Sequence, residues 1–151
     1  TLKENKGRLY LELKEFKKSE FLFKEVIKIR KSLIEKANPD LAEALNYLAL
    51  SLREQNKLDE AISIHNQVLT IMGNVIANNP GQISELTRRS ALYRARAYHT
   101  KGQILIRDNN IEDAKGNFRI AIRIFERTLG KNKKELILLK EKLKSLNEIN
   151  L

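Results

Sequence analysis

A chain of 151 residues is long enough for one domain that buries roughly 70% of the surface of its unfolded form. Hydrophobic residues make up 42% of the sequence and charged residues 32%, which is the balance of a globular protein and excludes disorder of the whole. The lack of cysteine excludes disulfide bonds and thiolate metal sites, and the short apolar runs predict no membrane-spanning helix. The net charge of +10 raises nucleic acid or an anionic membrane surface as a partner.

Two features of the sequence bear on its context. The first residue is Thr1 and not Met, so we expect the sequence to be a piece of a longer protein. A chain without cysteine suits a reducing compartment, and we expect a cytoplasmic location.

The opening segment, at about residues 1–37, predicts a helical hairpin. Gly7 and Tyr10 belong to its first helix, and Phe16 follows the turn. The second helix carries a small residue and three apolar residues at helical spacing: Ser19, Phe23, Val26 and Ile27. Pro39 then predicts a joint to the next hairpin, because the residue before a proline is pushed out of the helical region.

A second hairpin is predicted at about residues 40–78. Asn56 can adopt the left-handed conformation that ends a helix, and Asp59 suits the first turn of the helix that follows. Ala49 and Ala61 are small at the points where the two helices would cross. The sequence therefore predicts helix, tight turn and helix.

The same pattern returns in a third hairpin, at about residues 82–128. Gly102 and Ala114 stand where Ala49 and Ala61 stand in the second hairpin. The interval between the two patterns is long, so we expect an enlarged hairpin whose first helix runs over about 82–107.

A final amphipathic helix is predicted at about residues 133–150. Its leucines share one stripe, with lysines and glutamates opposite: Leu136, Leu139, Leu143 and Leu146. This helix would cover the open end of a stack of hairpins, as repeat arrays require.

Small residues that recur where helices cross distinguish a repeat array from an ordinary helical bundle. The equivalent positions in the first helices are Gly7, Ala49 and Gly102. This pattern resembles the tetratricopeptide repeat over roughly residues 2–128. The resemblance implies an all-α fold, namely a right-handed superhelical stack of about three helical hairpins plus a C-terminal capping helix, in a single domain over residues 1–151.

The number of residues between equivalent positions of successive hairpins indicates a narrower resemblance. From Ser19 to Ala61 it exceeds the usual repeat of about 34 residues. The extra length lies between the hairpins, around Pro39 and around residues 127–132, where the sequence is similar to the lengthened repeats of kinesin light chain.

The resemblance implies a protein-interaction scaffold whose concave groove holds a peptide or helix of a partner protein. With the core positions fixed, the following side chains are expected at the surface of the groove: Asn5, Arg8, Glu43, Asn46, Tyr47, Leu50, Arg53, Arg96, His99, Thr100 and Gln103. Asparagines can bond a peptide backbone, arginines can clamp carboxylates, and Tyr47 offers an apolar anchor with a polar tip. This mixture suits an acidic peptide that carries an apolar residue.

No motif predicts catalysis, a cofactor or a metal site. His65 and His99 lie on helices of different hairpins, and the sequence has no glycine-rich phosphate loop. His65 stands at the position that Phe23 and Phe118 occupy in the other hairpins, so we expect a partly buried packing residue. We therefore expect a protein that is not an enzyme and holds no metal.

Two other functions stay open. Nucleic-acid binding would use the basic excess between residues 88 and 127 and would weaken steeply with salt, although aromatic residues do not alternate with the arginines there. The basic residues are Arg88, Arg89, Arg94, Arg96, Lys101, Arg107, Arg119, Arg123 and Arg127. Self-association would use the apolar end faces that a cut repeat array exposes.

Overall fold

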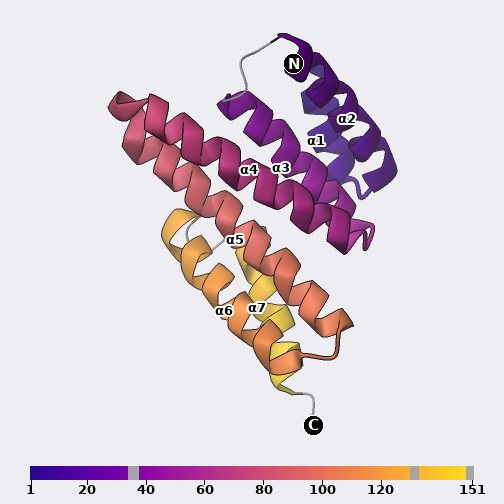
Figure 1. Ribbon diagram of the computed structural model, residues 1–151. Coiled ribbons are helices and arrows are strands. Elements are labelled where there is room, and N and C mark those ends of the chain that lie inside the picture. The colour runs from indigo at the N-terminus through magenta and orange to yellow at the C-terminus, as the bar shows by residue number, and fades with distance from the viewer. Residues whose placement is uncertain (34–37, 130–132, 149–151) are drawn as a thin grey trace. The chain divides into compact units, whose positions relative to one another are not determined.

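The computed structural model describes residues 1–33, 38–129 and 133–148, and it is helical without strands over these ranges (Figure 1). The predicted all-α class is therefore confirmed. The chain divides into two compact units, unit 1 over Thr1–Ser90 and unit 2 over Ala91–Leu151. The predicted ends of the first hairpin and of the last helix, and part of the 127–132 segment, lie outside the described residues.

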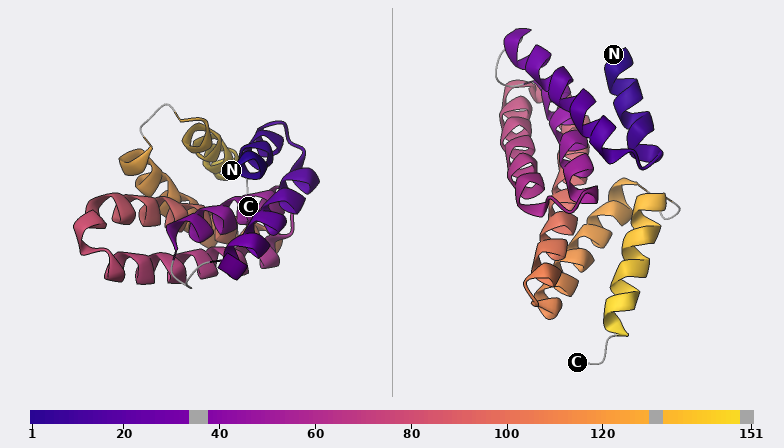
Figure 2. Two further views of the ribbon diagram at one scale, coloured as in Figure 1. Left: turned by 90° about the horizontal axis from the view of Figure 1, so that it is seen from above. Right: turned by 90° about the vertical axis from the view of Figure 1, so that its right-hand side faces the viewer.

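Unit 1 contains two helical hairpins. The first consists of α1 (Leu2–Glu12) and α2 (Phe16–Leu33), and the second of α3 (Pro39–Glu54) and α4 (Leu58–Asn78). A short 3₁₀ helix, η1 (Pro80–Gln82), follows α4. Helix α3 contacts α1, α2 and α4, so it is the central helix of this unit (Figures 1 and 2).

Helix α5 (Ile83–Arg107) provides the last residues of unit 1 and the first residues of unit 2. Its length confirms the long helix predicted after Pro80. Unit 2 continues with α6 (Ile111–Thr128) and α7 (Lys134–Asn147). Its core gathers side chains from all three helices: Ala95, Ala114, Phe118, Ala121, Phe125, Leu136, Leu139 and Leu146. The predicted leucine stripe of the final helix thus packs on α6, with Leu143 half-buried beside it.

The three hairpin turns share one backbone geometry. Lys14, Asn56 and Asn109 have positive φ angles of 60°, 61° and 61°. At Asn56, the backbone N–H bonds the carbonyl of Arg53, and the next N–H bonds the carbonyl of Leu52, each at 2.9 Å. The same pair of bonds closes the turns at Lys14 and Asn109, which makes each turn a Schellman motif. The left-handed conformation predicted for Asn56 is confirmed.

Helix crossings inside the hairpins are close because one partner is small. A Cβ atom added to Gly7 would lie 2.7 Å from Cε2 of Phe23, and one added to Gly102 would lie 2.5 Å from Cε1 of Phe118. Both rings are fully buried, and so is Ala49 at the equivalent place in the second hairpin. The recurrence of small residues seen in the sequence is therefore a packing requirement that the first and third hairpins share.

Candidate peptide-binding site

The first helices of the two hairpins in unit 1 meet at an aromatic stack. The guanidinium of Arg8 on α1 lies over the ring of Tyr47 on α3, 5.1 Å from its centroid. The Tyr47 ring also stacks on the ring of Phe23 of α2, with centroids 5.3 Å apart and an interplanar angle of 18°. Phe23 is buried, Tyr47 is half-buried and Arg8 is exposed. The stack therefore leads from the core to a surface cation.

Around this stack, the predicted residues differ in their availability. Asn5 is exposed on α1, one helical turn before Arg8. Glu43 on α3 is half-buried, and its Oε2 lies 3.4 Å from Nη2 of Arg89. Among the described residues, no carboxylate is paired with Arg8, which leaves its guanidinium able to bind an acidic group.

The expectation that all the predicted residues are surface groups is wrong for Asn46, Leu50 and Arg53 on α3. Their exposed fractions are 0%, 7% and 8%. Helix α3 contacts three other helices of its unit, so little of its circumference reaches solvent. A signal was available in the sequence, because Glu43 is the only charged residue between Leu41 and Leu52, as is typical of a helix buried on most sides.

Asn46 is an exceptional member of this buried set. Within the described parts of the chain, neither its amide nitrogen nor its amide oxygen has a hydrogen-bond partner. A buried polar group without a partner costs about 1–3 kcal/mol of stability. Asn46 thus occupies a core position that an apolar residue would fill at lower cost.

The predicted residues on α5 take part in the packing of unit 2. Arg96 forms a two-pronged ion pair with Glu135 of α7, with N···O distances of 3.0 and 3.1 Å. The ring of His99 meets Phe118 edge-on, with centroids 5.7 Å apart. Thr100, expected at the surface, is fully buried, and its hydroxyl donates to the carbonyl of Arg96 within α5.

Gln103 completes the α5 set. It is half-buried, and its Oε1 atom is buried without a hydrogen bond among the described residues. The predicted residues are thus divided between the two units. The exposed cation, Arg8, and the half-buried aromatic ring, Tyr47, both belong to unit 1.

Sequence reasoning missed an ionic cluster that joins the two hairpins of unit 1. The buried carboxylate of Glu20 on α2 accepts hydrogen bonds from Lys24 at 2.6 Å, Gln55 at 2.7 Å and Lys57 at 3.1 Å. Burial raises the pKa of Glu20, but these hydrogen bonds outweigh it and lower the pKa to about 2. The cluster ties α2 to the turn between α3 and α4.

Several basic residues of the 88–127 stretch are engaged with carboxylates. Arg88 pairs with Glu85 at 3.0 Å, and Arg107 pairs with Asp108 at 3.0 Å. Arg89 and Arg96 are also paired, as described above. These ion pairs reduce the positive charge that this stretch can offer to a phosphate backbone.

Within the described ranges, no three His, Asp or Glu side chains come together in a way that could hold a metal ion. His65 is buried, with an exposed fraction of 1%. It is more deeply buried than the partly buried packing residue that the sequence pattern predicts. No helix in the described part of the chain has the length and apolar character needed to cross a membrane.

The comparison with protein families agrees with this geometry. Residues 1–74 match the family model of the tetratricopeptide repeat. This part of the chain is similar to the tetratricopeptide repeat. The match covers α1 to α3 and most of α4, and the hairpin of α5 and α6 repeats the same Schellman turn and the same contact of glycine with phenylalanine. A search of curated proteins found no match. Tetratricopeptide repeats generally mediate interactions between proteins, and the helical hairpins of this chain are similar to that repeat.

Proposed function

We propose that this chain is a scaffold that binds a peptide or helix of a partner protein on the face formed by α1 and α3. The observation that carries the proposal is the stack of Arg8 on Tyr47, which places a cation that has no carboxylate partner among the described residues beside a half-buried aromatic ring. A carboxylate can bind Arg8 while an apolar side chain packs against the ring edge. The favoured ligand is therefore an acidic peptide with one apolar anchor.

Asn46 lies next to Tyr47 in α3 but is fully buried, so its amide does not reach a ligand on this face.

The experiment measures fluorescence anisotropy of a labelled peptide rich in Asp and Glu around one central Leu, titrated with the full chain. In the Arg8→Glu variant we expect affinity to fall about tenfold or more, since about 1.4 kcal/mol corresponds to a factor of ten. The matched control is Arg123→Glu, which makes the same charge change at an exposed site on α6 and should leave affinity within a factor of about two.

Two results would contradict the proposal. One is equal loss of affinity in both variants, which would show that the peptide responds only to net charge. The other is tighter binding of a mixed-sequence oligonucleotide than of the peptide, with affinity that falls steeply with salt, which would favour the nucleic-acid function.

A further inference from the structure

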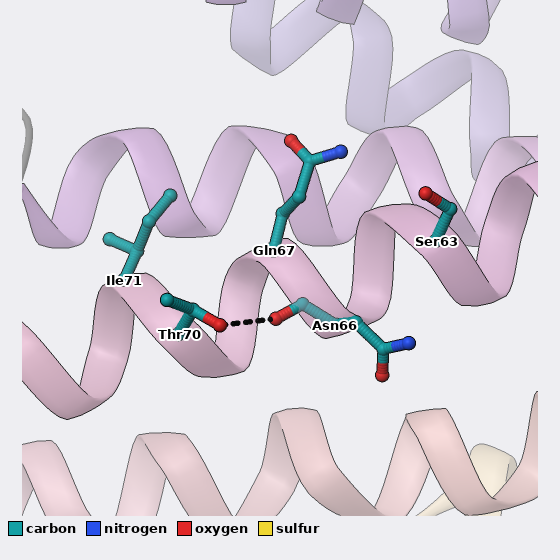
Figure 3. A pocket seen from close by; sticks show the side chains of 5 residues that line it. All are labelled: Ser63, Asn66, Gln67, Thr70 and Ile71. Atoms are coloured by element: carbon teal, nitrogen blue, oxygen red, sulfur yellow. Dashed lines mark hydrogen bonds between the residues drawn. The ribbon is translucent and has the colours of Figure 1, made fainter.

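Shallow pockets lie on the surface of both hairpins of unit 1. The pocket in Figure 3 runs along α4 in the second hairpin, and its lining has neither a charged nor an aromatic residue: Ser63, Asn66, Gln67, Thr70 and Ile71. The hydroxyl of Thr70 donates to the backbone carbonyl of Asn66 at 3.1 Å, so it is engaged within the helix. The pocket of the first hairpin, between α1 and α2, combines lysines with aromatic rings: Lys6, Tyr10, Lys17, Lys18, Phe21 and Leu22. This second pocket suits a ligand that has both negative charge and apolar surface.

The cations of the α1–α2 pocket stand beside its apolar side chains. Nζ of Lys18 lies 5.4 Å from the centroid of the Tyr10 ring, which is a cation–π contact, and 3.6 Å from Oε1 of Glu15. Lys6 and Lys17 are exposed and, among the described residues, are paired with no carboxylate. Phe21 has an exposed fraction of 61%. Unpaired ammonium groups and a protruding ring therefore share one surface.

A stripe of leucines on α1 continues this surface. Leu2, Leu9 and Leu13 recur at helical spacing with Lys6, so these side chains lie along one face of α1. The exposed fractions of the three leucines are 72%, 51% and 60%. Together with Phe21, they are four of the nine large hydrophobic side chains that are exposed in the described part of the chain. Such a cluster marks an interaction site, and we call the α1–α2 pocket and the leucine stripe together the hairpin-1 face.

The first hairpin carries half of the net charge of the chain in about a fifth of its length. Residues 1–31 contain ten lysines and arginines against five glutamates and no aspartate, which gives a net charge of +5 out of +10. Four of these glutamates are already paired with cations: Glu4 with Arg30, Glu15 with Lys18, Glu20 with Lys24 and Glu25 with Lys3. The fifth, Glu12, is exposed at the edge of the leucine stripe. The hairpin-1 face is therefore positive and favours an anionic occupant.

The protruding side chains of the hairpin-1 face indicate that this occupant is a lipid surface. Lys6 stands within the leucine stripe, so a rigid protein partner would bury its ammonium group among leucines, which is costly unless a carboxylate meets it there. At a bilayer interface, protruding apolar side chains enter the boundary between headgroups and acyl chains, while lysines extend their stems to the lipid phosphates. A fluid bilayer also needs no matching shape.

We propose that the hairpin-1 face docks on the surface of an anionic phospholipid bilayer. The leucines of the stripe and Phe21 enter the interface, and Lys6 and Lys17 bind the phosphate and carboxylate groups of the lipids. Arg8 comes two positions after Lys6 and therefore points to a different side of α1, so this site is separate from the proposed peptide site. Binding to lipid does not depend on the proposed function.

The first test uses tryptophan fluorescence, because the chain has no tryptophan of its own. The variant Phe21→Trp places one reporter in the hairpin-1 face, and Leu138→Trp, at a 53% exposed site on α7, is the matched control. We add vesicles of phosphatidylcholine and phosphatidylserine in equal parts. The emission of Phe21→Trp should shift to shorter wavelength as the indole enters the interface, and that of Leu138→Trp should stay unchanged. Vesicles of phosphatidylcholine alone should shift neither.

The second test measures the contribution of the lysines by co-sedimentation of the full chain with the same anionic vesicles. In the variant Lys6→Gln with Lys17→Gln we expect the partition coefficient to fall about tenfold or more. The matched control, Lys142→Gln with Lys144→Gln, removes the same charge at exposed sites on α7 and should keep most of the binding. Circular dichroism of each variant checks that the helices are intact.

Four outcomes would overturn the proposal. The chain could fail to bind the anionic vesicles. It could bind them without a shift in the emission of Phe21→Trp, which would place the contact elsewhere on the chain. The two pairs of lysine substitutions could weaken binding equally, which would assign it to net charge. The emission of Phe21→Trp could shift with a polyglutamate peptide and not with the vesicles, which would assign the hairpin-1 face to an acidic protein partner.

Discussion

The hydroxyl oxygens of Ser19 and Ser51, which are 32 residues apart in the sequence, lie 2.9 Å from each other in the buried contact between α2 and α3. Ser19 also donates to the carbonyl of Gly7 at 2.8 Å. A hydroxyl has one proton, so when Ser19 uses its proton on Gly7, Ser51 donates either to Ser19 or to the backbone carbonyl of Tyr47, which lies 2.9 Å away. When Ser51 donates to Ser19, a chain of hydrogen bonds links α3, α2 and α1.

We expect Ser19→Ala to lower the free energy of unfolding by about 1 kcal/mol, because the buried hydrogen bond to Gly7 is lost, and with it the contact to Ser51, while the small volume is kept. Urea denaturation measures this. Combining it with Ser51→Ala should cost less than the sum of the two single changes, since both remove the same bond. Strict additivity would show that the serines act separately. Ser63→Ala, at an exposed site on α4, is the control and should have little effect.

Alanine in place of Gly7 should destabilise the protein by about 1–3 kcal/mol, because the added methyl group collides with the buried ring of Phe23. Gly73→Ala, in the same unit, is the matched control. Its methyl group meets nothing within 4 Å, so removing the flexibility of glycine from a helix should stabilise by about 0.5–1 kcal/mol. Thermal unfolding of both variants should therefore shift in opposite directions, and shifts of the same sign would contradict the packing argument.

The Glu20 cluster predicts a pH dependence of stability. The folded pKa of about 2 lies below the ordinary value of 4.5, so the contribution of the ionised carboxylate is complete above pH 4.5. It is lost as pH falls from 4.5 through 2, by on the order of 2 kcal/mol or less for a cluster that includes exposed lysines. Denaturation curves of the wild type and Glu20→Gln should differ most at neutral pH and converge near pH 2. A constant difference across this range would exclude the cluster as the cause.

Asn46→Ala should change the free energy of unfolding by less than about 0.5 kcal/mol or should raise it, because no hydrogen bond is lost and an unpaired buried amide is removed. Affinity for the acidic peptide should not change, because the side chain is fully buried. Chemical denaturation and peptide titration of the same variant measure the two effects. A loss of stability above about 1 kcal/mol would indicate that the amide is paired in the folded protein.

Local features of the fold could be predicted from the sequence. The turn at Asn56 and the small residues at helix crossings depend on interactions within a few turns of one hairpin. Lys14 was harder to predict as a left-handed residue, because lysine adopts positive φ less readily than asparagine or glycine. Its equivalence to Asn56 and Asn109 is recognised only when the three turns are aligned.

Long-range contacts explain most of what could not be predicted about the candidate site. Arg96 has the chemistry to bind a ligand carboxylate, but Glu135, 39 residues later, already occupies it. Asn46 and Arg53 lie at groove positions by helical periodicity, yet their exposure depends on how many helices surround α3. Periodicity gives the direction of a side chain, whereas solvent access requires knowledge of its neighbours.

The shared geometry of the Schellman turns has a practical consequence for engineering. One extra residue beside Asn56 would rotate α4 by about 100° about its own axis and turn its apolar side away from α3. The link between α4 and α5 is not held by such a turn, and Pro80 and Gly81 are exposed there. A fluorophore or an affinity tag is therefore best inserted at Gly81, where an insertion does not rotate the helices of one hairpin relative to each other.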